Sequence, residues 1–196
     1  ASKDVLELIN CAEIVMFRGK SLGKNNIQYF DTPILKDFLH NVQMDNKLKE
    51  AVSNNHFVLK YQPQFYADSK ELRGVEALLR WKDTEKSSLI GPGVFIPMAE
   101  KNGTIIHIGS WVVDESLRCY AKWKEKYGYS MIMSINISAI QYKRNNFVKM
   151  IMDAVEKYQI EPSEVELEIT ETVLMEDLDE IREKLQTLRE YGIRIS

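Results

Sequence analysis

At residues 131–137 the chain reads Met131-Ile132-Met133-Ser134-Ile135-Asn136-Ile137, and its first three residues form a continuous apolar run. Continuous apolar character of this kind is typical of a buried strand in a parallel sheet. Apolar residues at helical spacing precede this stretch at 105–127 and follow it at 147–158. Strands separated by helices of this length predict βα units around a parallel sheet, and therefore an α/β fold.

The same alternation of strands and helices extends in both directions from this strand. Upstream, two strand patterns enclose turn-like residues, which predicts a hairpin-like start, and a short helical pattern follows. Downstream, a strand, a long helix and a further strand are expected. The predicted elements are strands at 57–63 and 72–79, a helix at 94–101, a strand at 165–169, a helix at 172–191 and a strand from 193 onward.

The first 55 residues follow a different pattern. Residues 4–20 carry apolar side chains at helical spacing, and 26–30 alternate like a short strand before the turn residues at 31–33. A second helical pattern without glycine covers 34–53, which favours a stiff helical connector over a flexible linker. We therefore predict three parts: 1–31, a connector at 32–55, and the α/β region at 56–196.

Composition restricts the classes of partner and compartment. The chain has 26 Lys and Arg against 29 Asp and Glu, a formal net charge of −3, so no basic excess favours a nucleic-acid polymer. No apolar run reaches the length of about 18 residues that a membrane span needs. Cys11 and Cys119 form no CxxC pattern, which favours reduced thiols over a disulfide framework. A cytoplasmic location is expected, with a membrane tether in an upstream region left open.

Three polar residues stand near the ends of predicted parallel strands: Glu76, Asn136 and Glu168. In a (β/α) barrel, side chains at the carboxyl ends of the strands converge on one face. Two carboxylates and one amide supply hard oxygen ligands that suit Mg²⁺ or Mn²⁺. Taken alone, each residue is better explained as a polar strand end that caps a loop. The prediction of a metal site therefore depends on their joint placement.

Residues 57–196 resemble the EAL family of bacterial cyclic di-GMP phosphodiesterases. Five motifs carry the resemblance and occur in the family's order: Tyr61-Gln62-Pro63-Gln64, Gly74-Val75-Glu76-Ala77-Leu78-Leu79-Arg80-Trp81, Phe95-Ile96-Pro97-Met98-Ala99-Glu100, Asn136-Ile137-Ser138 and Glu166-Leu167-Glu168-Ile169-Thr170-Glu171. The resemblance implies a TIM-like barrel whose first strand is antiparallel to the others. It also implies hydrolysis of cyclic di-GMP to linear pGpG in second-messenger signalling.

The resemblance assigns roles to individual residues. It implies that Glu76, Asn136 and Glu168 are metal ligands for Mg²⁺ or Mn²⁺, and that Glu76, Glu168 and Glu171 are catalytic, with Glu171 steadying a loop near the metals. Gln62, Arg80 and Leu78 are implied as contacts of the dinucleotide. A guanidinium such as that of Arg80 matches the oxygens of a phosphate in a bidentate manner.

The family pattern continues with an Asp-Asp pair, a lysine and another glutamate that these 196 residues do not contain. We therefore expect an incomplete barrel that is inactive alone and that forms homo-oligomers through its barrel edges. Two alternatives to a phosphodiesterase stay open: a catalytically inactive module that senses cyclic di-GMP, and an inert structural fragment. The residues whose identity would distinguish a sensor from an enzyme belong to the part of the family pattern that these 196 residues do not contain.

Residues 1–31 show a second, shorter resemblance. The run from Cys11 to Lys20, followed by Gly23-Lys24-Asn25 and Tyr29-Phe30-Asp31, is similar to the closing helix and strand of a GGDEF domain, the fold of diguanylate cyclases. Phe17 and Gly19 stand where that family usually has tyrosine and alanine. The resemblance implies a GGDEF remnant ahead of the connector and does not bear on cyclase activity.

Overall fold

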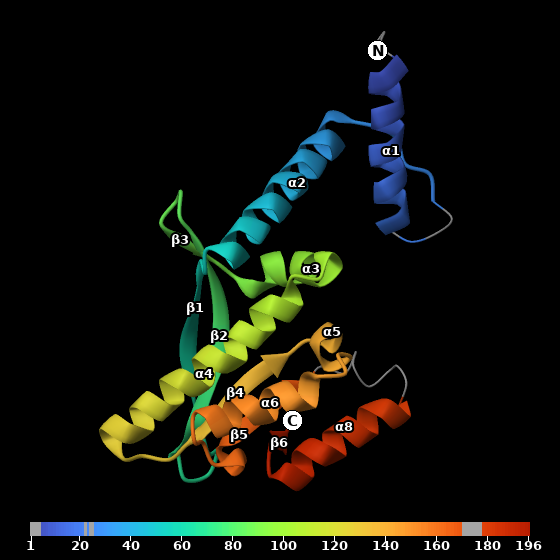
Figure 1. Cartoon of the computed structure of the whole chain (residues 1–196). Helices are drawn as coiled ribbons and strands as arrows, with labels where there is room; N and C mark the ends of the chain where they lie inside the picture. The colour runs from blue at the N-terminus through green and yellow to red at the C-terminus, as the bar shows by residue number, and fades with distance from the viewer. Residues whose placement is uncertain (1–4, 22, 24–25, 170–177) are drawn as a thin grey trace. The chain divides into compact units, whose positions relative to one another are not determined.

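The structure is a computed structural model that describes residues 5–21, 23, 26–169 and 178–196. The chain divides into two compact units, residues 1–50 and residues 51–196. Figure 1 shows the order of the helices and strands along the chain.

The regular secondary structure described in the first unit is helical. Helix α1 spans Val5–Ser21, and α2 begins at Thr32 and continues to Ser53. The start of α2 is stabilised by Asp31, whose Oδ1 accepts a hydrogen bond from the Ile34 amide at 2.8 Å. These two helices confirm the helical patterns predicted at 4–20 and 34–53, as far as the structure describes those residues.

The strand predicted at 26–30 is wrong. These residues have no regular secondary structure, although their side chains alternate as a strand's would. A strand depends on backbone hydrogen bonds to a neighbour, and the described residues of this unit include no second strand to supply them. The alternation of residues 26–30 alone is therefore not enough to form a strand.

The second unit is built on a mixed sheet with the strand order β1-β2-β4-β5-β6. Strand β1 is antiparallel to β2, whereas β2, β4, β5 and β6 are parallel to one another. This arrangement confirms an α/β fold whose first strand runs against the four parallel strands. The strands are β1 (Phe57–Phe65), β2 (Leu72–Asp83), β3 (Ser88–Ile90), β4 (Ile132–Ile137), β5 (Val165–Ile169) and β6 (Arg194–Ile195).

Helices connect the parallel strands and cover one face of the sheet. The longest, α4, packs on β1, β2 and β4 and also contacts α6, which in turn contacts α8. Tyr120 of α4 is fully buried, and its hydroxyl accepts a hydrogen bond from the Met131 amide at 3.0 Å just before β4. The helices are α3 (Pro92–Asn102), α4 (Ile105–Tyr127), α5 (Ala139–Tyr142), α6 (Phe147–Lys157), the 3₁₀ helix η1 (Pro162–Glu164) and α8 (Leu178–Tyr191).

The two faces of the central strands differ in polarity. In β4, Met133 and Ile135 are fully buried and belong to the apolar core, while Ser134 and Asn136 lie on the opposite face. Strand β5 shows the same period of two, with buried Leu167 between two glutamates. The sheet therefore buries one apolar face under the helices and presents a polar face on its other side.

Three short elements were not predicted, β3, α5 and the 3₁₀ helix η1. All three are too short for periodicity to reveal. Strand β3 pairs with the extended end of β2, and α5 begins with a capping box in which the side chains of Ser138 and Gln141 bond each other's backbone amides.

Three further expectations can be compared with the fold. Cys11 and Cys119 are both free thiols, as expected. Within the described residues, none of the helices combines the length and the apolar character that crossing a bilayer requires. Strands β1 and β6 lie at the ends of the sheet order, and association through these edges stays a prediction.

Gly74 is predicted to be essential for the pairing of β2 with β4. It is buried opposite Ile132, and a Cβ atom placed on it would lie 2.1 Å from the Ile132 carbonyl oxygen. We expect Gly74→Ala to lower the free energy of unfolding by about 1–3 kcal/mol, since backbone atoms of the ladder must move apart. Urea unfolding followed by tryptophan fluorescence measures this change.

The matched control for this substitution is Gly93→Ala. Gly93 lies in α3, has no atom within 4 Å of the added Cβ, and has an ordinary helical environment in which alanine is favourable. Its unfolding free energy should be unchanged or slightly raised. Equal stability of the two variants would show that β2 and β4 can separate at Gly74 without cost.

Candidate active site

Strand register brings the predicted metal ligands to one region of the polar face. Glu76 pairs with Ser134 across β2 and β4, and Asn136 pairs with Glu168 across β4 and β5. The Asn136 amide donates from Nδ2 to Glu76 Oε1 at 2.7 Å, which joins residues 60 positions apart in sequence. The structure thus places an amide and a carboxylate from different strands in direct contact.

Glu168 completes the predicted ligand set. Glu168 pairs with Asn136 in the parallel register of β4 and β5; burial raises the pKa of its carboxyl group, and the nearby negative charge of Glu76 raises it further. A hydrogen bond from Gln64 opposes this change. Glu76, Asn136 and Glu168 therefore form one cluster, which we call the ligand cluster.

The chemistry of the ligand cluster fits a hard divalent cation. Two carboxylates and an amide oxygen are ligands that Mg²⁺ and Mn²⁺ accept, and a cation between Glu76 and Glu168 would relieve their repulsion. Mg²⁺ takes about six oxygens, so three protein ligands leave further positions to other groups or water. Among the described residues, no group of three or more His, Cys, Asp or Glu side chains is placed to hold a metal.

The predicted nucleotide contacts lie beside the ligand cluster. Gln62 of β1 is exposed and stands opposite Glu76 in the antiparallel register of β1 and β2. Leu78 and Arg80 follow Glu76 at the alternate positions of β2 that share its face, and both are half-buried. Glu171 lies outside the described residues.

The Arg80 side chain bends back onto its own strand. Its Nη1 donates to the carbonyl oxygen of Leu79 at 2.8 Å, which orients the guanidinium beside the β2 backbone. A guanidinium carries five N–H donors, so this bond leaves others for a phosphate. The local geometry is compatible with the predicted role.

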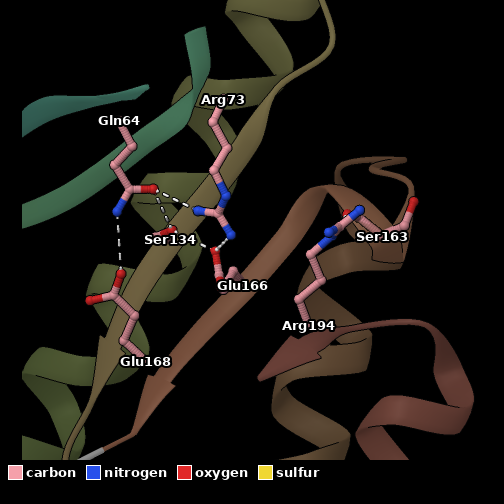
Figure 2. A network of polar contacts seen from close by, with 7 residues as sticks. All are labelled: Gln64, Arg73, Ser134, Ser163, Glu166, Glu168 and Arg194. Carbon is pink, nitrogen blue, oxygen red and sulfur yellow. Dashed lines mark hydrogen bonds and ion pairs between the residues drawn. The ribbon is translucent and has the colours of Figure 1, made fainter. Parts of the chain in front are cut away.

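Four further polar residues meet next to the ligand cluster and were not predicted as site residues. They are Gln64, Arg73, Ser134 and Glu166, which we call the interior polar cluster; Figure 2 shows them together with Glu168. A signal for three of them was present in the sequence. Gln62 and Gln64, Ser134 and Asn136, and Glu166 and Glu168 are polar pairs two residues apart, a period that places both members on one strand face.

The chain is similar to known proteins over most of its length. The EAL domain family matches residues 45–196. The signaling protein YkoW of Bacillus subtilis is 38% identical over 193 residues, covering 98% of this chain and 24% of its own length. The bifunctional diguanylate cyclase/cyclic di-GMP phosphodiesterase MucR of Pseudomonas aeruginosa is 34% identical over 190 residues, covering 97% of this chain and 28% of its own length.

Solved structures give the same result. The PaMucR phosphodiesterase in complex with c-di-GMP is 37% identical, with a TM-score of 0.73 over 78% of this chain and 62% of that one. The EAL enzyme Bd1971 bound to cAMP and cyclic di-GMP is 27% identical, with a TM-score of 0.74 over all of this chain and 51% of that one.

The chain spans about a quarter of the length of these curated relatives. Within that span, the family match covers the mixed sheet, its antiparallel first strand and all three residues of the ligand cluster. Because the match extends over residues 45–196, well beyond half of the chain, this chain belongs to the EAL domain family.

Proposed function

We propose that the protein containing this chain hydrolyses cyclic di-GMP to linear pGpG and depends on Mg²⁺ or Mn²⁺. The observation that carries the proposal is the ligand cluster, in which Glu76, Asn136 and Glu168 from three neighbouring parallel strands converge on one face. Named relatives support the substrate: MucR and NbdA of Pseudomonas aeruginosa and PdeR of Escherichia coli are all called cyclic di-GMP phosphodiesterases.

The residues of this chain have separate tasks in the proposed reaction. Glu76, Asn136 and Glu168 would hold divalent metal, which lowers the pKa of bound water and neutralises charge on the phosphodiester. Gln62 lies opposite Glu76, where its amide can hydrogen-bond the nucleotide close to the metal ligands. Arg80 offers its remaining N–H groups to a phosphate oxygen, and Leu78 lies between Glu76 and Arg80 on the same strand face. The role of Glu171 in steadying a loop stays a prediction.

The region ahead of the EAL domain is proposed to be the end of a GGDEF domain, in residues 1–31. Two observations support this assignment. The alignments with curated relatives cover 96% to 98% of the chain and so extend upstream of residue 45, where the family match begins. One of these relatives, MucR, is named as both a diguanylate cyclase and a phosphodiesterase.

The function is tested by incubating the full-length, EDTA-treated protein with cyclic di-GMP and separating the products by chromatography. We expect pGpG to form after Mg²⁺ or Mn²⁺ is restored and not before. Isothermal titration of cyclic di-GMP accompanies the assay. Binding with unchanged nucleotide in the presence of both metals would contradict the proposal and favour the sensor alternative.

A further inference from the structure

The interior polar cluster is built around an ion pair on the polar face of the sheet. Arg73 Nη2 lies 2.5 Å from Glu166 Oε2, and the side chains of these residues are 26% and 9% exposed, respectively. Charge-assisted hydrogen bonds of this length are stronger than neutral ones and hold both groups in a defined orientation. The pair connects the first residues of β2 with β5, across β4.

Arg73 also determines which way the Gln64 amide points. Its Nη1 donates to Gln64 Oε1 at 2.9 Å, while Nη2 contacts Glu166. Arginine has donors only, so the oxygen of the glutamine must face the guanidinium. If the amide were reversed, its NH₂ group would oppose the guanidinium and its oxygen would oppose the Glu168 carboxylate.

Ser134 supports the same orientation from the neighbouring strand. Its buried hydroxyl lies 3.2 Å from Gln64 Oε1 and 3.2 Å from Glu166 Oε2. A serine hydroxyl has one proton, so it donates to one of these oxygens at a time. Whichever oxygen accepts, the Ser134 hydroxyl holds the interior polar cluster together on the side away from Glu168.

The consequence is that Gln64 Nε2 faces Glu168. The distance from Nε2 to Glu168 Oε1 is 3.4 Å, and Figure 2 shows this contact at the end of a path that runs from Glu166 through Arg73 and Gln64. Arg194 appears in the same view but donates to the Ser163 carbonyl oxygen and takes no part in this path. Arg73 is therefore linked to Glu168 by hydrogen bonds through Gln64, in addition to the direct attraction between its positive charge and the Glu168 carboxylate.

We propose that Arg73 and Gln64 are positioning residues, which hold the Glu168 carboxylate in the orientation that a divalent cation requires. The proposal rests on the proposed function of Glu168 as a metal ligand. Hydrogen-bond partners of a metal-ligating group restrict its orientation, and their loss typically weakens metal affinity about 10–100-fold. A merely structural ion pair between Arg73 and Glu166 would leave metal affinity unchanged when Gln64 is altered.

Two substitutions separate these possibilities without leaving a buried charge unpaired. Gln64→Met removes the donor to Glu168 and keeps both Arg73 and Glu166. Arg73→Lys keeps the positive charge beside Glu166 but lacks the planar fork that contacts Gln64 and Glu166 at once. The matched control is Arg118→Lys in α4, where the guanidinium bonds both carboxylate oxygens of Glu115 at 2.6 Å outside the two clusters.

The experiment measures Mn²⁺ binding to the full-length protein by isothermal titration in the absence of nucleotide. We expect Gln64→Met and Arg73→Lys each to weaken Mn²⁺ binding by about tenfold or more. The double variant should be no weaker than the weaker single one, because both act on the same contact. Arg118→Lys should bind as the unaltered protein does, and thermal unfolding checks that all variants fold.

The outcomes distinguish this inference from the proposed function. If Glu168→Gln weakens Mn²⁺ binding but Gln64→Met and Arg73→Lys do not, Glu168 is a ligand and the positioning role is wrong. A second outcome is that Glu168→Gln, Gln64→Met and Arg73→Lys all weaken Mn²⁺ binding, but the unaltered protein releases no pGpG. In that case the positioning role holds and the proposed function fails. If Glu168→Gln leaves Mn²⁺ binding unchanged, Glu168 is not a ligand and the positioning role is wrong, whereas pGpG formation alone decides the proposed function.

Discussion

Replacing Glu76 by alanine in the full-length protein is expected to lower the rate of cyclic di-GMP hydrolysis by about a thousandfold or more. A thousandfold loss corresponds to roughly 4 kcal/mol of transition-state stabilisation, within the several kcal/mol that metal coordination supplies. Glu76 is the residue that the Asn136 amide contacts and whose charge raises the pKa of Glu168, so its removal alters every member of the ligand cluster. Chromatography of the nucleotide products gives the rate.

The control for this substitution is Glu161→Ala, which removes an exposed carboxylate just before η1. Its rate should equal that of the unaltered protein. Circular dichroism compares the folding of both variants, since Glu76 lies inside β2. Turnover in a folded Glu76→Ala protein at the rate of the control would remove Glu76 from the metal site.

The 196-residue chain, prepared alone, is expected to show no measurable phosphodiesterase activity and to bind divalent metal weakly. The reason is the number of ligands in these residues. The ligand cluster offers oxygens from three side chains, about half of what one Mg²⁺ ion takes, and a second ion would need carboxylates of its own. Without two ions at bridging distance, water is only weakly activated for attack on the phosphodiester.

Three measurements test this expectation separately: titration with Mn²⁺, titration with cyclic di-GMP, and a product assay. Formation of pGpG by the isolated chain, lost on Glu168→Ala, would contradict it and indicate that two copies complete each other's site.

The isolated chain is also expected to form oligomers through its sheet edges. Light scattering over a concentration series measures this association.

Much of the second unit could be predicted from local patterns in the sequence. The apolar pattern at 131–137 and the helical spacing at 105–127 correspond to β4 and α4. A strand or helix that buries one face needs apolar residues at a regular spacing, and this spacing is visible in the local sequence. The turn-like residues between 57–63 and 72–79 predicted a hairpin, and the family resemblance implied the same antiparallel direction of β1, which the structure confirms. The residues 170–177, which include Glu171, lie outside the part of the chain that the structure describes.

The sequence alone therefore established the α/β class, the order of the main strands and helices, and the three residues Glu76, Asn136 and Glu168 as candidates for one site. Tertiary structure decided two things that no local pattern contains. Residues 26–30 alternate like a strand but lack a partner, because strand formation depends on hydrogen bonds to another segment. Arg73 joins Gln64, on the adjacent strand β1, to Glu166 on β5, 93 residues away, because strand register brings these side chains together across β4. Register depends on the whole sheet rather than on any one strand.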